Sequence, residues 1–146
     1  LLDRPADQAQ LVDWVVGAAI VIRRDAWLQV GPLDETFFMY FEETDWCRRS
    51  AAAGWETHYL PAAQVVHFEG QSSGQVVAAR TLRFQRSKLR YTRKYFGPGW
   101  TAGLRLFLWL TFAFQWAEEG VKWLLGHRRE LRRERLLAYS QILRGL

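Results

Sequence analysis

The sequence changes character near residue 76, and this change constrains the fold more than any other feature. Before that point, short apolar segments alternate with Gly, Pro and Asp, which is typical of short strands, turns and helices. After it, residues 76–96 have the length and pattern of a long helix, which the Gly-Pro-Gly sequence at 97–99 would break. The remaining predictions are helices over 100–125 and 128–143, with an α/β part over residues 1–75 and a helical region over residues 76–146.

Within the α/β part, the apolar run at 12–22 is rich in β-branched residues and predicts a strand buried on both faces. Gly17 inside this run indicates a bulge or the close approach of a ligand. Turn-forming residues mark the other predicted elements: a short helix over 24–30 ended by Gly31, a loop over 34–40, a helix over 42–53 ended by Gly54, and short strands over 56–60 and 64–68.

Composition places the chain among domain-sized proteins with enough apolar material for a core. It has 146 residues, of which 49% are hydrophobic, and eight are Trp. The single cysteine, Cys47, excludes an internal disulfide and suggests a reducing compartment. The chain begins without Met and without the features of a signal peptide, so we expect it to be part of a longer protein.

Charge is unevenly distributed, because residues 76–96 carry Lys and Arg but no acid, and residues 127–135 form a second basic block. Such a distribution indicates a phosphate-bearing partner such as anionic lipid, a sugar diphosphate or nucleic acid, although a solvated helix face would look the same. No RNP, helix-turn-helix or zinc pattern accompanies the basic residues, which disfavours nucleic acid.

An aromatic run leads into three acids at the predicted start of the helix over 42–53. Glu42, Glu43 and Asp45 lie there, followed by Arg48 and Arg49. The acids suit a helix N-terminus, and Asp45 can pair with Arg49 four residues later, which would be a purely structural role. In the functional interpretation, one acid is a general base whose pKa is raised by its neighbours.

The motifs VDWVVGAAIVIRRDAW and GPLDETFFMYFEETDWCRRSAAAGWETHYLPAAQVVHFEGQSS together resemble the acceptor-side half of family two glycosyltransferases with the GT-A fold, in particular rhamnosyltransferases. The resemblance covers about residues 10 to 95. It implies that the chain is the C-terminal part of a GT-A α/β domain followed by about three helices. In that family the second acid of a Glu-Asp pair is the catalytic base, which here corresponds to Glu43, with Glu42 or Asp45 as alternatives.

The resemblance also implies inverting transfer from a nucleotide-sugar donor to a hydroxyl of a glycan or lipid-linked acceptor. His67 would help to bind a divalent metal, Mg²⁺ or Mn²⁺. Most of the metal and nucleotide site would belong to an N-terminal half with an Asp-x-Asp motif, without which we expect little or no activity. The residues expected near donor or acceptor are Asp13, Trp14, Gly17, Ala18, Tyr40, Arg48 and Arg49.

The apolar stretch 104–117 is too short to span a bilayer, and three interpretations remain open for it. It could lie in the membrane interface, form a homodimer or domain contact, or pack on the N-terminal half. A lipid-linked acceptor would place the protein in the cytoplasm, at the inner face of the cytoplasmic membrane. The alternative to an enzyme is a non-catalytic module that binds lipid or saccharide.

Overall fold

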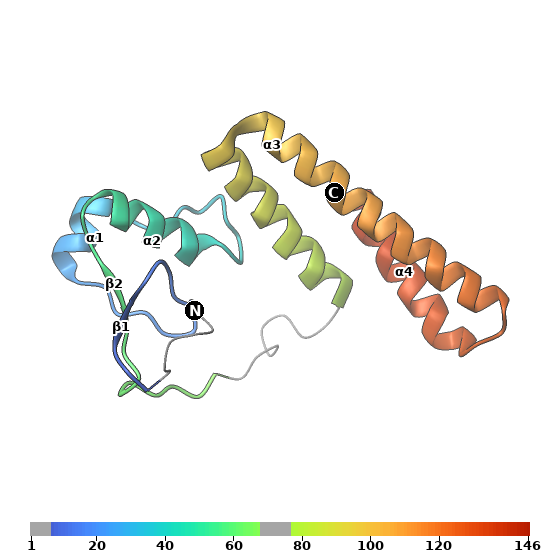
Figure 1. Cartoon of the computed structure of the whole chain (residues 1–146), viewed down its shortest axis with the longest axis horizontal. Helices are drawn as coiled ribbons and strands as arrows, with labels where there is room; N and C mark the ends of the chain where they lie inside the picture. The colour runs from blue at the N-terminus through green and yellow to red at the C-terminus, as the bar shows by residue number, and fades with distance from the viewer. Residues whose placement is uncertain (1–6, 68–76) are drawn as a thin grey trace. The chain divides into compact units, whose positions relative to one another are not determined.

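The computed structural model describes residues 7–67 and 77–146, which fall into two compact units, 1–68 and 69–146 (Figure 1). The first unit contains β1 (Gln10–Val12), α1 (Arg24–Val30), α2 (Glu42–Ala52) and β2 (Thr57–Tyr59). The second contains α3 (Val77–Leu124) and α4 (Arg129–Gly145). A small sheet with two helices is thus followed by a helical region, as the sequence indicated.

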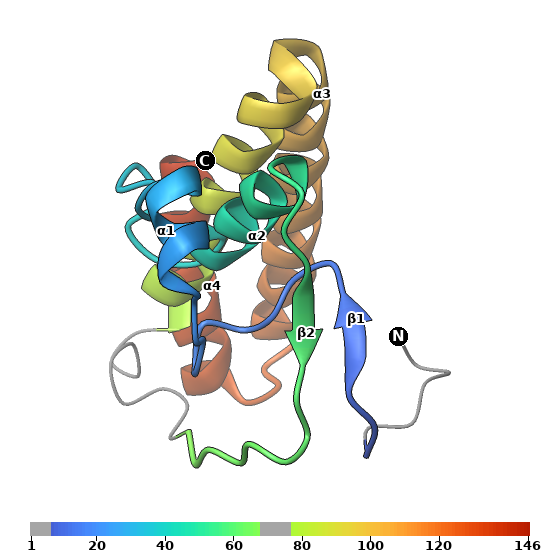
Figure 2. The same ribbon diagram turned by 90° about the vertical axis from the view of Figure 1, so that its left-hand side faces the viewer.

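The sheet is a short antiparallel pair in which Gln10, Leu11 and Val12 of β1 lie opposite Tyr59, His58 and Thr57 of β2 (Figure 2). The predicted strand over 12–22 is wrong beyond Val12, because residues 13–23 form no strand and the Val21 side chain is 101% exposed. An apolar run becomes a strand only where a neighbouring strand pairs with it, and among the described residues β1 pairs with β2 alone.

The strand predicted over 64–68 is also wrong as far as the described residues extend. Residues 64–67 carry no regular structure, and residue 68 lies outside the described part of the chain. Only the segment around β2 forms the strand that was expected over 56–60.

The two short helices agree with prediction. α1 ends at Gly31, whose φ of 84° suits glycine and whose N–H donates to the Trp27 carbonyl at 2.9 Å. α2 begins at Glu42, as expected, and Gly54 follows it. Ala26, Trp46 and Cys47 form the core of this unit, and the Trp46 indole N–H donates to the Gly31 carbonyl at 2.9 Å. The end of α1 is therefore fastened to α2.

In the second unit, α3 consists of two helices that meet at a kink. Gly97 at the kink has φ 86° and ψ −179°, a backbone conformation that a side chain would strain, and Pro98 follows it. The predicted break at residues 97–99 is confirmed. α4 packs on α3 around a core of buried apolar side chains: Ala78, Leu89, Leu108, Phe112 and Ile142.

A buried ion pair also joins α3 to α4, and the sequence did not reveal it. The Glu119 side chain is 7% exposed, and it accepts hydrogen bonds from Arg132 at 2.7 Å and from Arg135 at 3.1 Å. Burial alone would raise the pKa of Glu119, but the hydrogen bonds and charges of the two guanidinium groups outweigh it and lower the pKa.

Replacing Glu119 with Gln is expected to lower the free energy of unfolding by about 3 kcal/mol, because the buried Arg132 loses its countercharge. Since the native pKa of Glu119 is depressed, the difference from the unmodified chain should be largest at neutral pH. It should disappear as the pH falls below the usual range of a glutamate. Urea unfolding followed by circular dichroism at several pH values measures this.

The adjacent Glu118 provides a matched control, because it is half exposed and pairs with Lys122 on the same helix. Glu118→Gln should change the free energy of unfolding by no more than about 0.5 kcal/mol. Equal effects of the two substitutions would show that the buried ion pair does not stabilise the packing of α4 on α3.

Candidate functional site

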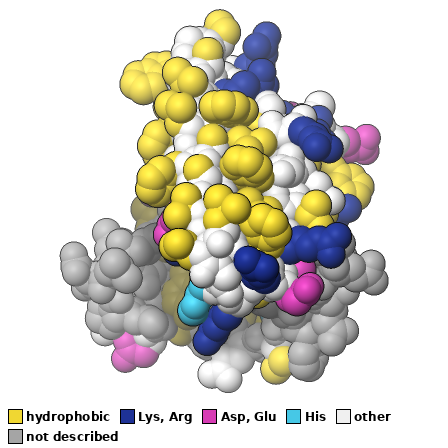
Figure 3. All heavy atoms as spheres, turned by 90° about the vertical axis from the view of Figure 1, so that its right-hand side faces the viewer, with side chains coloured by type: hydrophobic (Ala, Val, Ile, Leu, Met, Phe, Trp, Pro, Cys, Tyr) yellow, Lys and Arg dark blue, Asp and Glu magenta, His cyan; other side chains and the backbone are white. Residues whose placement is uncertain are grey.

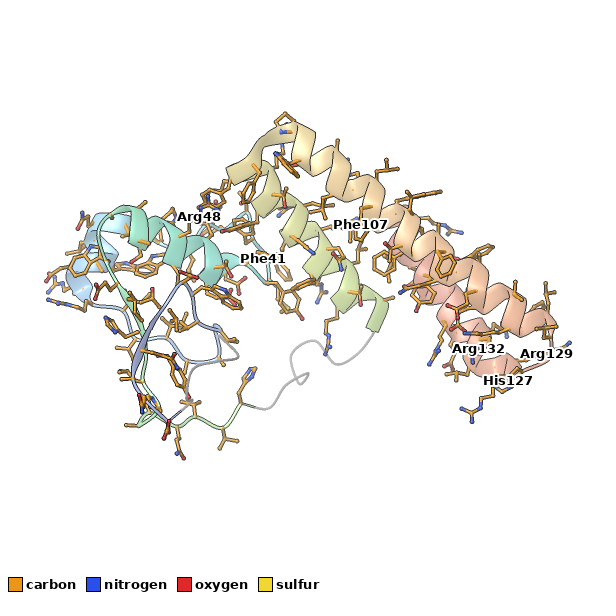
Figure 4. The ribbon with its side chains drawn as sticks, in the orientation of Figure 1. Phe41, Arg48, Phe107, His127, Arg129 and Arg132 are labelled. Atoms are coloured by element: carbon orange, nitrogen blue, oxygen red, sulfur yellow. The ribbon has the colours of Figure 1, made fainter. Side chains whose placement is uncertain are left out.

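The acid pair at the start of α2 is reached through an unusual turn. Tyr40 has φ 69° and Phe41 has φ 71°, the left-handed region that bulky residues rarely adopt. Each such residue costs on the order of 1–3 kcal/mol and persists only where the surrounding structure enforces it. Phe41 lies at the N-terminus of α2 (Figure 4), and its carbonyl accepts the Asp45 N–H at 2.8 Å. Strain is therefore concentrated immediately before Glu42 and Glu43.

Glu43 is held against the segment that was predicted to be a strand. Its Oε1 accepts a long hydrogen bond of 3.4 Å from the Gly17 N–H. A Cβ placed on Gly17 would lie 3.6 Å from the Glu43 Cδ, so the two residues are in contact. Within this chain, the group that approaches Gly17 closely is the carboxylate of Glu43, and the approach of a ligand to Gly17 stays a prediction.

The other oxygen of Glu43, Oε2, is buried and has no hydrogen-bond partner among the residues that the structure describes. A buried carboxylate oxygen without a donor is uncommon, because lost hydration is normally replaced by a hydrogen bond. No ion pair of Glu43 with Arg or Lys occurs within the described chain, so its charge remains available to an incoming proton.

Glu42 shares this environment. Its Oε2 is also buried and unpaired within the described residues. Burial raises the pKa of Glu42, a hydrogen bond from its own backbone N–H opposes the change, and the charge of Glu43 adds to it. The two adjacent carboxylates therefore both have an oxygen that is removed from water and not neutralised.

Asp45 has a different environment. It is completely buried, and its Oδ2 accepts a hydrogen bond from Arg49 Nε at 2.9 Å. Arg49 also donates to the carbonyls of Val30 at 2.8 Å and Pro32 at 2.7 Å. The predicted pair between Asp45 and Arg49 is confirmed. Through Arg49, this pair holds α2 against the end of α1. Because Asp45 is completely buried, an acceptor hydroxyl cannot reach its carboxylate.

The other residues expected to contact donor or acceptor lie on two segments. Asp13, Trp14 and Ala18 are exposed in the irregular stretch that also carries Gly17. Tyr40 is half-buried in the strained turn, and Arg48 is exposed on α2 (Figure 4). The structure thus brings Gly17 and Glu43 together, and the binding roles of the remaining residues stay predictions.

His67 is exposed at the edge of the first described range, and its role as a metal ligand stays a prediction. Residues 7–67 and 77–146 contain no group of three or more His, Cys, Asp or Glu side chains that could hold a metal ion. One imidazole does not suffice for Mg²⁺ or Mn²⁺, which need several oxygen ligands. These residues therefore do not fit a complete divalent-metal site.

One surface depression is lined by residues that sequence reasoning did not single out. Asp7, Tyr59 and residues 61–65 form it, and the acid pair is not part of its lining.

A second feature that the sequence did not indicate is that Arg49 donates hydrogen bonds to the backbone carbonyls of Val30 and Pro32. A carbonyl acceptor leaves no mark on a sequence, because every residue has one.

Because the pKa of Glu42 is raised in the folded chain, its charged form opposes folding at neutral pH. Glu42→Gln should therefore leave the free energy of unfolding at pH 7 unchanged or higher. The difference from the unmodified chain should shrink as the pH falls toward about 4, where a free glutamate is protonated. Urea unfolding at both pH values measures it. Glu35→Gln, at an exposed loop position, is the control. A less stable Glu42→Gln variant at pH 7 would contradict this interpretation.

Comparison with known proteins supports a specific relationship. The chain is 35% identical over 94 residues to N-acetylglucosaminyl-diphospho-decaprenol L-rhamnosyltransferase from two strains of Mycobacterium tuberculosis, covering 64% of this chain and 31% of the relative. It is 36% identical over 58 residues to the rhamnosyltransferase WbbL of Escherichia coli, covering 40% of this chain and 22% of the relative.

The chain spans about a third of the length of the mycobacterial relatives that it matches, 31%. No protein-family profile matches it, and no solved structure is significantly similar. The curated matches nevertheless confirm the resemblance indicated by the motifs. Over the matched segment, the chain is similar to rhamnosyltransferases.

Proposed function

We propose that this chain is the acceptor-side part of an inverting glycosyltransferase with the GT-A fold. It would serve the transfer of a sugar, rhamnose by analogy, from a nucleotide-sugar donor to a hydroxyl of a glycan or lipid-linked acceptor. The names of the relatives support this, since they are rhamnosyltransferases and two of them act on N-acetylglucosaminyl-diphospho-decaprenol. The relatives disfavour the alternative of a non-catalytic binding module, and they associate the chain with polysaccharide biosynthesis.

The observation that carries the proposal is the state of the Glu43 carboxylate. Its Oε1 accepts a hydrogen bond from the Gly17 N–H, and its Oε2 is buried without a hydrogen-bond partner in the described chain. A general base needs a charge that no cation has neutralised and a position from which it can accept a proton. Among the three acids, Asp45 meets neither requirement. Its charge is neutralised by Arg49, and no part of its side chain is exposed to an acceptor.

In the proposed reaction, Glu43 accepts the proton of the acceptor hydroxyl as that oxygen attacks the anomeric carbon of the donor sugar. The bond from the anomeric carbon to the nucleoside diphosphate breaks, and the diphosphate leaves with the electron pair on the opposite side. Configuration at that carbon is inverted. Trp14 and Tyr40 are the proposed platforms for sugar rings, and Asp13, Ala18 and Arg48 flank them.

With a lipid-linked acceptor and a nucleotide-sugar donor, the proposed location is the inner face of the cytoplasmic membrane. The described residues do not form a complete metal site, so no step of this mechanism is assigned to a metal. If a metal takes part, His67 is the residue that the family resemblance assigns to it, and oxygen ligands would have to complete the site.

Glu43→Gln in the complete gene product that carries this chain tests the assignment. The substitution keeps the shape of the side chain and its contact with Gly17 but removes the base. We expect the turnover number for rhamnosyl transfer to fall about 10²- to 10⁴-fold. Donor affinity, measured by calorimetry, should change little. Transfer from a deoxythymidine diphosphate sugar to a lipid-linked acceptor would be followed by product chromatography.

Two further variants make the result specific. Asp45→Asn should lower activity only in proportion to a loss of thermal stability, because Asp45 holds α2 in place. Glu35→Gln, at an exposed position in the preceding loop, should leave both unchanged. Full turnover by Glu43→Gln would eliminate Glu43 as the base, and a selective loss in Glu42→Gln would assign that role to Glu42.

A further inference from the structure

The second half of α3 has an apolar face that the fold of the unit does not use. Over residues 103–125, apolar side chains recur every three or four positions, which places them on one side of the helix. Most of them are strongly exposed, and Figure 3 shows hydrophobic side chains gathered along one face of the molecule. We call this surface the apolar face, and it consists of Gly103, Leu106, Phe107, Leu110, Phe114, Ala117, Val121, Leu124 and Leu125.

The opposite side of the same helix already faces the core. Thr101, Leu108, Phe112 and Glu119 are buried there, and the Phe112 ring packs against Tyr139 of α4. A helix that only covered a core would be polar on its outer side. No charged residue interrupts the apolar face, and the nearest acid, Glu118, is paired with Lys122. Exposed contiguous apolar surface of this kind marks a site of interaction.

The helix that carries the apolar face, α3, is also rich in Lys and Arg. Residues 77–117 contain no acidic residue, whereas Arg80, Arg83, Arg86, Arg90, Arg93 and Lys94 lie on the first half of α3. The turn that follows α3 adds His127, Arg128 and Arg129, all exposed (Figure 4).

We propose that this surface docks onto the anionic headgroups of a lipid bilayer, with α3 lying in the plane of the interface. The exposed Phe, Leu and Val side chains of the apolar face would enter the boundary between headgroups and acyl chains, and Arg and Lys would pair with lipid phosphates. No helix within the described residues is long and apolar enough to cross a membrane. Apolar burial and electrostatic attraction together suffice for stable surface binding, whereas either alone is weak.

Charge complementarity favours a bilayer over a second copy of the chain. The chain carries a net charge of +5, and residues 77–117 of α3 contain Lys and Arg but no acid. A symmetric contact through this face would bring the same patch of each copy together and place like charges near one another. On an anionic membrane, by contrast, these positive charges are attracted to the headgroups and strengthen binding. This inference rests on α3 and the turn after it, and it does not depend on the identity of the catalytic base.

Flotation of the 146-residue chain with vesicles tests the proposal. We expect binding to phosphatidylcholine vesicles that contain phosphatidylglycerol, much weaker binding to phosphatidylcholine alone, and a decline as the salt concentration rises. Leu124→Glu should weaken binding at least about tenfold, because a charge replaces buried apolar surface. Leu28→Glu on α1 is the matched control, since Leu28 is 69% exposed and Leu124 is 70% exposed.

The basic residues are tested separately. Arg128→Gln and Arg129→Gln should each weaken binding to the anionic vesicles about fivefold, and Arg24→Gln on α1 should have little effect. Circular dichroism confirms that each variant remains folded. Absence of flotation with anionic vesicles would overturn the proposal, as would equal binding by Leu124→Glu and the unmodified chain. A concentration-dependent dimer that Leu124→Glu dissociates, without vesicle binding, would assign the apolar face to a second copy instead.

Discussion

The contact between Asp45 and Arg49 determines the arrangement of the first unit. A buried carboxylate orients the guanidinium, which then donates to the carbonyls of Val30 and Pro32. Val30 is the last residue of α1 and Pro32 lies just beyond it, so these carbonyls have no partner within the helix. One side chain therefore satisfies the terminus of α1 and fixes α2 beside it. Such a pair contributes through geometry more than through net stability, because desolvation cancels much of its electrostatic attraction.

This arrangement separates the roles of three acids that stand within four positions of one another. Asp45 points into the unit and is neutralised, whereas Glu42 and Glu43 retain a buried oxygen without a partner in the described chain. In a soluble protein that gained nothing from such groups, both would be expected to turn toward water. These two buried oxygens, together with the contact of Glu43 with Gly17, distinguish the candidate site from an ordinary helix N-terminus. The similarity to rhamnosyltransferases supports the substrate class that we propose for that chemistry.

Local signals in the sequence predicted local structure well. Gly31, Gly54 and Gly97 marked the ends of helices, because each adopts a backbone conformation that other residues avoid. The pair of Asp45 and Arg49 followed from a spacing of four residues. Prediction failed where the outcome depends on distant partners. The apolar run at 12–22 finds no neighbouring strand among the described residues, and the partners of Glu119 lie 13 and 16 residues away on another helix.

The strained turn before α2 has a consequence for how such a protein can change. Glycine at position 40 or 41 would relieve the backbone of an unfavourable conformation, and on that ground it would stabilise the chain. It would also free the loop to meet the helix at many angles, so the two carboxylates would no longer be presented in one orientation. Tyr40 and Phe41, held in a strained backbone conformation, thus fix the direction in which the chain enters α2. A substitution that raises the stability of the chain at this turn would therefore lower the rigidity with which the turn presents the two carboxylates.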